Sequence, residues 1–171
     1  MALVRFTGTA GGAERVFDFG NGQANNNIVL YRSGTVNLGL QLLNGASSYI
    51  LIANSQIVQN TWQVFAVRYN RSTNLTQIFT NGVLVASGTS TQTLTSRTLI
   101  SNFIGRSNWA ADSYSNMDFG GLYVYDRSLS DTEMTILCQD GGLTFIEYNE
   151  NCFVSIYHSM RLPQKSNSEI F

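Results

Sequence analysis

The residues best suited to binding chemistry gather in one segment, Ser107–Tyr114, which holds an indole, a phenol, an amide and a carboxylate. Trp109 and Tyr114 can stack on a sugar face or on an apolar patch of a partner protein. Asn108 and Asp112 can hydrogen-bond sugar hydroxyls, or give oxygen ligands to calcium, which needs several of them. The segment therefore predicts a binding loop for a glycan or a protein surface, with calcium as the cofactor that its residues suit.

A second candidate binding loop runs from Gly20 to Asn27 (GNGQANNN), directly after Asp18. It is polar and rich in residues that tolerate a left-handed backbone. The alternative is that it is only a solvated connection between two strands.

Catalytic residues are hard to assemble from this sequence. A retaining glycoside hydrolase needs two carboxyl groups about 5 Å apart, which alternate positions of one strand would provide. On the predicted strands no glutamate lies two residues from another acid; the five glutamates are Glu14, Glu133, Glu147, Glu150 and Glu169. The single histidine, His158, lies near the end of the chain, away from the candidate loops. We therefore expect a protein that is not an enzyme, with a degenerate hydrolase-like enzyme as the alternative.

The elements that must position these loops are short strands. The segment from Trp62 to Tyr69 is apolar on both faces, so we expect it to be buried between two layers. A hairpin follows, because Asn81-Gly82 favours a type I′ turn; its turn pairs Phe79 with Leu84 and Ile78 with Val85. Other strands are expected over residues 3–7, 15–20, 28–32, 36–43, 49–53, 99–105 and 117–125. This pattern predicts an all-β sandwich.

One helix interrupts the strands. Ser130 and Glu133 have the spacing of a capping box. Met134, Ile136 and Leu137 provide an apolar face, and Gly141-Gly142 ends the helix. We therefore expect one short helix near the C-terminal end of the domain.

Composition narrows the class of partner. Only 12% of the 171 residues are charged and the formal net charge is −1, against a usual charged share of about a quarter. The scattered cations argue against nucleic acid, and no apolar run approaches the ~20 residues of a membrane span. Richness in Asn, Ser, Thr and Gly is common in extracellular β-modules, although residues 1–5 do not begin a signal peptide. We expect an extracellular protein, or part of an extracellular multidomain protein; the alternative is a cytoplasmic one.

Two kinds of covalent modification are also suggested. Cys138 and Cys152 can close a disulfide worth about 3 kcal/mol in an oxidising compartment; the alternative is two free thiols. Asn70 and Asn74 begin glycosylation sequons between two central strands, although two sequons are no more than chance gives.

The order of five segments resembles that of the LamG-like jellyroll domains of the concanavalin A-like lectin and glucanase superfamily. The segments are ERVFDFGNGQANNNIVLYR, NTWQVFAVRYN, FTNGVLVASG, FIGRSNWAADSY and GGLYVYDRSLSDTEM, and the resemblance covers about residues 2–137. It implies a jellyroll of two antiparallel sheets over residues 1–142 and a C-terminal tail over 143–171. It also implies a structural alternative for the Ser107–Tyr114 loop, in which Trp109 packs under the loop and the polar groups bond backbone.

The resemblance has two departures. Members of the family usually have one or two more strands before the FDFG block, so we expect the chain to begin inside the domain and to leave a sheet edge open for association. The tail contains two strand-like runs, 143–148 and 152–157, and one hypothesis is that part of the tail covers that edge. The alternative is a mis-drawn gene start or a disordered appendage. The leading interpretation is a non-catalytic module that presents loops to a carbohydrate or a protein surface; a structural or adhesion domain is the alternative.

Overall fold

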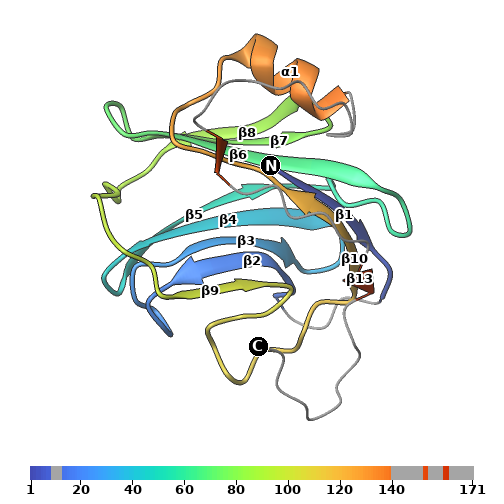
Figure 1. Cartoon of the computed structure of the whole chain (residues 1–171), viewed down its shortest axis with the longest axis horizontal. Coiled ribbons are helices and arrows are strands. Elements are labelled where there is room, and N and C mark those ends of the chain that lie inside the picture. Colours follow the sequence, from blue (N-terminus) through green and yellow to red (C-terminus); the bar gives the residue numbers. More distant parts are fainter. Residues whose placement is uncertain (9–12, 140–151, 154–159, 162–171) are drawn as a thin grey trace.

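The computed structural model describes residues 1–8, 13–139, 152–153 and 160–161, and these form two facing antiparallel sheets with one helix (Figure 1). One sheet has six strands, in the order β13 (Met160–Arg161), β10 (Met117–Leu122), β1 (Ala2–Phe6), β6 (Gln63–Asn70), β7 (Leu75–Thr80) and β8 (Val83–Thr89). The other has five, in the order β5 (Ser47–Ala53), β4 (Asn37–Asn44), β3 (Ile28–Ser33), β2 (Arg15–Gly20) and β9 (Ser101–Ile104). The predicted all-β sandwich, with its jellyroll-type pair of antiparallel sheets and a short helix, is confirmed.

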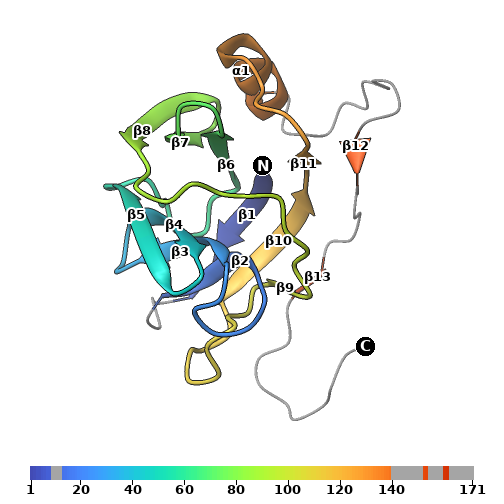
Figure 2. The same cartoon turned by 90° about the vertical axis from the view of Figure 1, so that its left-hand side faces the viewer.

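The core lies between the two sheets, as the two-sided strands predict. Phe65 of β6 is fully buried there, with its ring centroid 6.3 Å from that of Phe6. On the opposite face of β6, Val64 and Ala66 belong to a second cluster, between the six-stranded sheet and α1 (Asp131–Gln139). Figure 2 shows α1 outside the layer that contains β6 and β7. Strand β6 is therefore covered on both sides.

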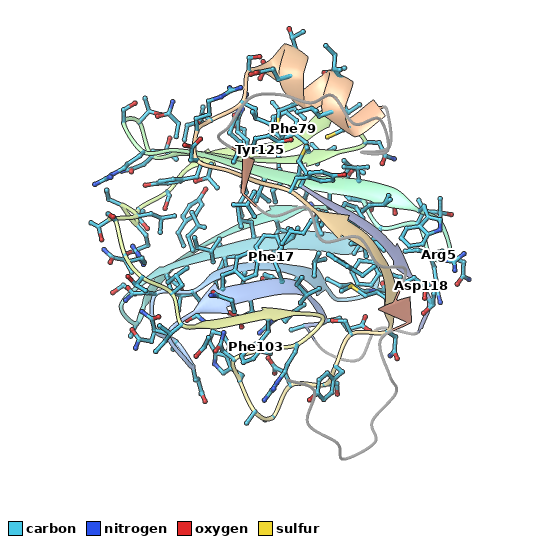
Figure 3. The ribbon with its side chains drawn as sticks, viewed as in Figure 1. Arg5, Phe17, Phe79, Phe103, Asp118 and Tyr125 are labelled. Carbon is cyan, nitrogen blue, oxygen red and sulfur yellow. The ribbon has the colours of Figure 1, made fainter. Side chains whose placement is uncertain are left out.

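Trp62 was predicted to begin this buried strand, and that prediction is wrong. Strand β6 begins at Gln63, and the Trp62 side chain is 41% exposed. The guanidinium carbon of Arg5 lies 5.2 Å from the Trp62 ring centroid, and Arg5 also forms an ion pair with Asp118. Figure 3 shows Arg5 and Asp118 close together at one end of β1 and β10. Trp62 lies on the outer face of the sheet, where Arg5 rather than α1 packs against its ring. The guanidinium covers part of the ring, and the rest stays exposed to solvent.

The hairpin turn is confirmed and its register is partly wrong. Asn81 and Gly82 have φ angles of 49° and 81°, as a type I′ turn requires. Phe79 pairs with Leu84 as predicted, but Ile78 pairs with Ala86 rather than Val85. An irregularity between Ile78 and Phe79 shifts the register by one residue, in the manner of a β-bulge.

The capping box of α1 is confirmed. The amide of Ser130 donates to the carboxylate of Glu133 at 2.8 Å, and the amide of Glu133 donates to Ser130 Oγ at 3.2 Å. Met134 and Cys138 are buried against the sheet with Leu137 beside them, whereas Ile136, predicted to share this face, is exposed. Ile136 lies two residues from Met134, so the 3.6-residue period turns it away from the sheet. The predicted helix end at Gly141-Gly142 lies outside the described residues.

Replacing Arg127 with alanine is expected to raise the pKa of Glu133. Arg127 donates two hydrogen bonds to this carboxylate and, with the Ser130 contacts, lowers its pKa from 4.5 to about 2. The contribution of Glu133 to stability is therefore present above its unfolded pKa and is lost as the pH falls through about 2. A carboxyl-carbon NMR titration checks this, with Arg71→Ala as a control that leaves Glu133 untouched. An unchanged pKa in the Arg127 variant would contradict it.

Near the end of the chain, the structure differs from the expected strand over 117–125 and adds two short strands. The expected strand over 117–125 is divided at Tyr123 into β10 and β11 (Val124–Tyr125). Strand β12 (Cys152–Phe153) pairs with β11, and β13 pairs with the outer edge of β10. Strand β13 lies at the β10 edge but outside both runs expected to cover an edge. The rest of the tail, with the expected 142/143 domain boundary, lies outside the described residues, so the role of the tail stays a prediction.

Cys138 is a buried free thiol among the described residues; its predicted disulfide with Cys152 stays a prediction. Cys138 Sγ lies 3.6 Å from the sulfur of Met1, and burial raises the pKa of the thiol.

None of the described helical residues forms a segment both long enough and apolar enough to cross a membrane.

A candidate binding surface on the five-stranded sheet

The outer face of the five-stranded sheet lies on the side of the sandwich away from α1, which packs on β6 of the other sheet. Residues paired across adjacent strands lie on the same face of the sheet, so each row of paired residues has one orientation. The row Phe17, Leu30, Leu40 and Leu51 packs into the core. The neighbouring row therefore faces outward; it contains Phe103, Asp18, Val29, Gln41 and Ile50. Asp18 and Val29 in this row are fully buried, whereas Ile50 is 49% exposed, so a cover lies over β2 and β3 but not over β5.

The cover is the segment between β9 and β10, and Asp18 anchors it. One carboxylate oxygen of Asp18 accepts hydrogen bonds from the side-chain amides of Asn27 and Asn108, each at 2.8 Å. The other oxygen accepts one from the backbone amide of Asn108, also at 2.8 Å. Asp18 therefore joins the two loops that the sequence singled out, the Gly20–Asn27 loop and the Ser107–Tyr114 loop.

Arg15 provides the second anchor. Its guanidinium carbon lies 5.3 Å from the ring centroid of Tyr31 and 5.5 Å from that of Trp109. The same group donates to Asp112 Oδ2 at 2.8 Å and to the carbonyl of Ala13 at 2.8 Å. A buried cation is thus paired with a carboxylate and contacts two aromatic rings, a combination that offsets its desolvation.

The loop also closes on itself. Ser107 Oγ donates to Asp112 Oδ2 at 2.7 Å and accepts from the backbone amide of Trp109 at 3.0 Å. At its far end, Ser115 Oγ donates to the carbonyl of Arg15 at 2.6 Å. The loop is therefore fixed at both ends and beneath its centre.

The four predicted site residues fall into two groups. Asn108 and Asp112 point toward the sheet. Asn108 donates hydrogen bonds to Asp18, and Asp112 accepts them from Arg15 and Ser107. Trp109 is half-buried against Arg15. Only Tyr114 stands out from the loop, with 48% of its surface exposed. Asn108, Trp109 and Asp112 are therefore engaged within the protein, the two polar ones mainly with side chains rather than with the backbone named in the structural alternative, while Tyr114 is exposed. Ligand binding by any of the four stays a prediction.

Two further residues lie beside Tyr114. The guanidinium carbon of Arg106 lies 6.0 Å from the Tyr114 ring centroid and 4.5 Å from that of Phe103. Arg106 is exposed, and within the described part of the chain it forms no ion pair. We call Phe103, Arg106 and Tyr114 the loop-tip surface; Figure 3 marks Phe103 on β9, on the side of the molecule away from α1. The sequence signal for Phe103 and Arg106 was their place at the start of the FIGRSNW run.

The two residues that the sequence offered for calcium are already engaged. Asp112 contacts the guanidinium of Arg15, and the side-chain amide of Asn108 donates to Asp18. Among the described residues, no group of three His, Cys, Asp or Glu side chains could hold a metal ion. A role for calcium remains a prediction.

The two sequons lie where the sequence placed them, at the turn between β6 and β7. Asn74 has a φ of 55°, its oxygen accepts from Tyr69 and its nitrogen donates to Thr93. The oxygen of Asn70 accepts from Ser72. Glycosylation at either position stays a prediction.

The fold and this anchored loop define a lectin-like β-sandwich that presents loops at the rim of a sheet. A family model described as the concanavalin A-like lectin/glucanases superfamily matches residues 2–135. The chain therefore belongs to this superfamily. No curated protein sequence matches it.

Solved structures with this fold include sugar complexes. The CBM40 module of the Ruminococcus gnavus IT-sialidase, bound to α2,3-sialyllactose, has a TM-score of 0.64 and 17% identity, with 80% of each chain covered. The same module bound to α2,6-sialyllactose has a TM-score of 0.63, 17% identity and 80% coverage of each chain. A leech intramolecular trans-sialidase complexed with 2,7-anhydro-Neu5Ac has a TM-score of 0.58 and 20% identity, covering 88% of this chain and 24% of that one. At these identities the likeness establishes a common fold.

Proposed function

We propose that this chain is a non-catalytic carbohydrate-binding module whose sugar contacts are made by the loop-tip surface. The observation that supports this most is the pair of Tyr114 and Arg106, an exposed phenol ring beside an exposed guanidinium, on a loop fixed from below. A sugar ring stacks on an exposed aromatic face, and the planar guanidinium binds a carboxylate through two parallel hydrogen bonds. A rigid support lowers the cost of ordering the site on binding.

The loop-tip surface suits an acidic sugar better than a neutral one. Arg106 has no carboxylate partner within the described residues, so a ligand carboxylate would satisfy it without displacing an internal contact. The solved relatives carry sialic acid ligands, which have such a carboxylate, and this makes sialyllactose the first probe to use. An extracellular location accords with this ligand and with the low charged content of the chain.

Replacing Tyr114 or Arg106 with alanine is expected to weaken the binding of sialyllactose about tenfold, because about 1.4 kcal/mol is a reasonable scale for either contact. The melting temperature should stay within about 3 °C of the wild type, since both side chains are exposed. Isothermal titration calorimetry with sialyllactose and lactose measures the effect, and Arg71→Ala serves as a control for an exposed arginine elsewhere.

Three outcomes decide the proposal. Loss of sialyllactose binding in both variants, with Arg71→Ala unaffected, supports it. Binding that survives both changes places the site elsewhere on the molecule. If neither sugar binds the wild-type chain, the protein-surface alternative is favoured instead.

A further inference from the structure

A cavity of about 510 Å³, open to solvent on one side, lies between the two sheets near the β10–β11 junction. The five-stranded sheet contributes Phe17, Phe19, Ile28, Leu40 and Leu42 to its wall; the six-stranded sheet and its connections contribute Val67, Tyr69, Leu94 and Leu122. This cavity lies on the inner face of β2, whereas the loop-tip surface lies on the outer face of the same sheet. The two are therefore separate sites, and a ligand in the cavity does not depend on sugar binding at the loop-tip surface.

The cavity wall is apolar and incompletely covered. The rings of Phe17 and Phe19 are stacked, with centroids 4.8 Å apart and planes 19° apart, so they form one apolar unit in the wall. Phe19, Val67 and Leu94 are only half-buried although they face the interior, while Phe6 and Phe65 elsewhere between the sheets are fully buried. Close-packed interiors rarely leave such space. An apolar body placed here would gain about 25 cal/mol for each Å² of surface removed from water.

The mouth of the cavity is polar and, among the described residues, offers an unengaged cation. Arg68 is held by Asp131 at 2.6 Å and by the carbonyl of Leu129 at 2.6 Å, and Arg127 is held by Glu133. Arg71, on the same rim, is exposed and forms no ion pair with any described residue. Ser72, next to Arg71, also lies on this rim, but its hydroxyl already donates to Asn70 Oδ1 at 2.7 Å, so Arg71 is the group left for an anion.

We infer that the cavity binds an anionic amphiphile, with its apolar body against Phe17 and Phe19 and its anionic head at Arg71. A volume of about 510 Å³ lies within the roughly 300–1,000 Å³ range of ligand pockets, which combine apolar walls with a few polar groups. A sugar is a poor occupant, because the walls offer its hydroxyls few hydrogen-bond partners.

The test uses the full chain and two kinds of probe. The fluorescence of 8-anilinonaphthalene-1-sulfonate should rise on binding, and decanoate should displace it at least tenfold more effectively than decanol. Arg71→Ala should weaken binding of the sulfonate probe about tenfold, the scale of one charge-assisted contact. Leu94→Trp should abolish binding by filling the cavity. Near-UV circular dichroism must stay native, since loosely packed states also bind this dye.

Arg106→Ala is the matched control, since Arg106 lies on the outer face of the sheet and should leave the dye signal unchanged. No fluorescence change with the wild-type chain would overturn the inference. So would binding that survives both Arg71→Ala and Leu94→Trp. Equal displacement by decanol and decanoate would overturn the assignment of an anionic head. Sialyllactose binding is unaffected by any of these results, so this inference and the sugar proposal fail independently.

Discussion

Replacement of Asp18 by alanine is expected to lower the free energy of unfolding by about 4 kcal/mol. The carboxylate is fully buried and accepts three hydrogen bonds, from the side chain of Asn27 and from the side chain and backbone of Asn108. Each hydrogen bond to a charged group contributes roughly 1.5–3 kcal/mol, and the donors left behind would be buried without a partner. These contributions are not additive, which is why the expected total is below their sum.

The same change should also weaken sugar binding, because Asp18 fixes the loop that presents Tyr114. Urea unfolding measures the stability, and calorimetry with sialyllactose, under conditions where the variant is folded, measures the binding. Asp126→Asn is the matched control, since Asp126 is exposed and its loss should cost less than about 0.5 kcal/mol. A loss below about 1 kcal/mol for Asp18→Ala would show that water replaces the carboxylate at little cost.

Replacement of Glu14 by alanine should be comparably damaging, at about 4 kcal/mol. Glu14 and Arg32 form an ion pair at 3.1 Å, with 1% and 4% of their side chains exposed. Removing one partner of such a pair typically costs about 3–5 kcal/mol, because the other charge stays buried. Asn116 would also lose the acceptor of its backbone amide, which donates to Glu14 at 2.8 Å.

A double variant distinguishes the ion pair from simple packing. Glu14→Leu combined with Arg32→Met removes both charges and keeps most of the volume, so it should be more stable than Glu14→Ala alone. Thermal and urea unfolding of the single and double variants give the coupling energy. A double variant less stable than Glu14→Ala would contradict this expectation. It would mean that the attraction between the two charges exceeds the free-energy cost of their desolvation.

The sequence predicted those parts of the fold that depend on local pattern. Strand β6 was recognisable because both its faces are apolar, and α1 because Ser130 and Glu133 have the spacing of a capping box. The exposure of Trp62 and the register of Ile78 were missed, because they depend on a neighbouring strand and on a backbone irregularity. Neither leaves a signal in the segment itself.

The candidate site was predicted by residue type but not by role. Asn108 and Asp112 are bound by Asp18 and Arg15, which lie 90 and 97 positions away in the chain. Spacing within the loop cannot reveal such partners, so polar side chains that anchor the loop resembled side chains that bind a ligand. Tyr114, which was named with Trp109 as a residue able to stack on a ligand, is exposed in the structure, and its use in binding stays a prediction.

The burial of Arg15 between two aromatic rings implies that dissolved salt acts on the two arginines of this region unequally. Ions in solution screen exposed charges strongly and buried ones weakly. The Arg15–Asp112 pair, which holds the loop, should therefore keep its strength from about 0.05 to 0.5 M sodium chloride, while the attraction of Arg106 for an anion fades. A fall in sialyllactose affinity over that range would then measure the electrostatic contribution of Arg106, with the scaffold beneath it unchanged.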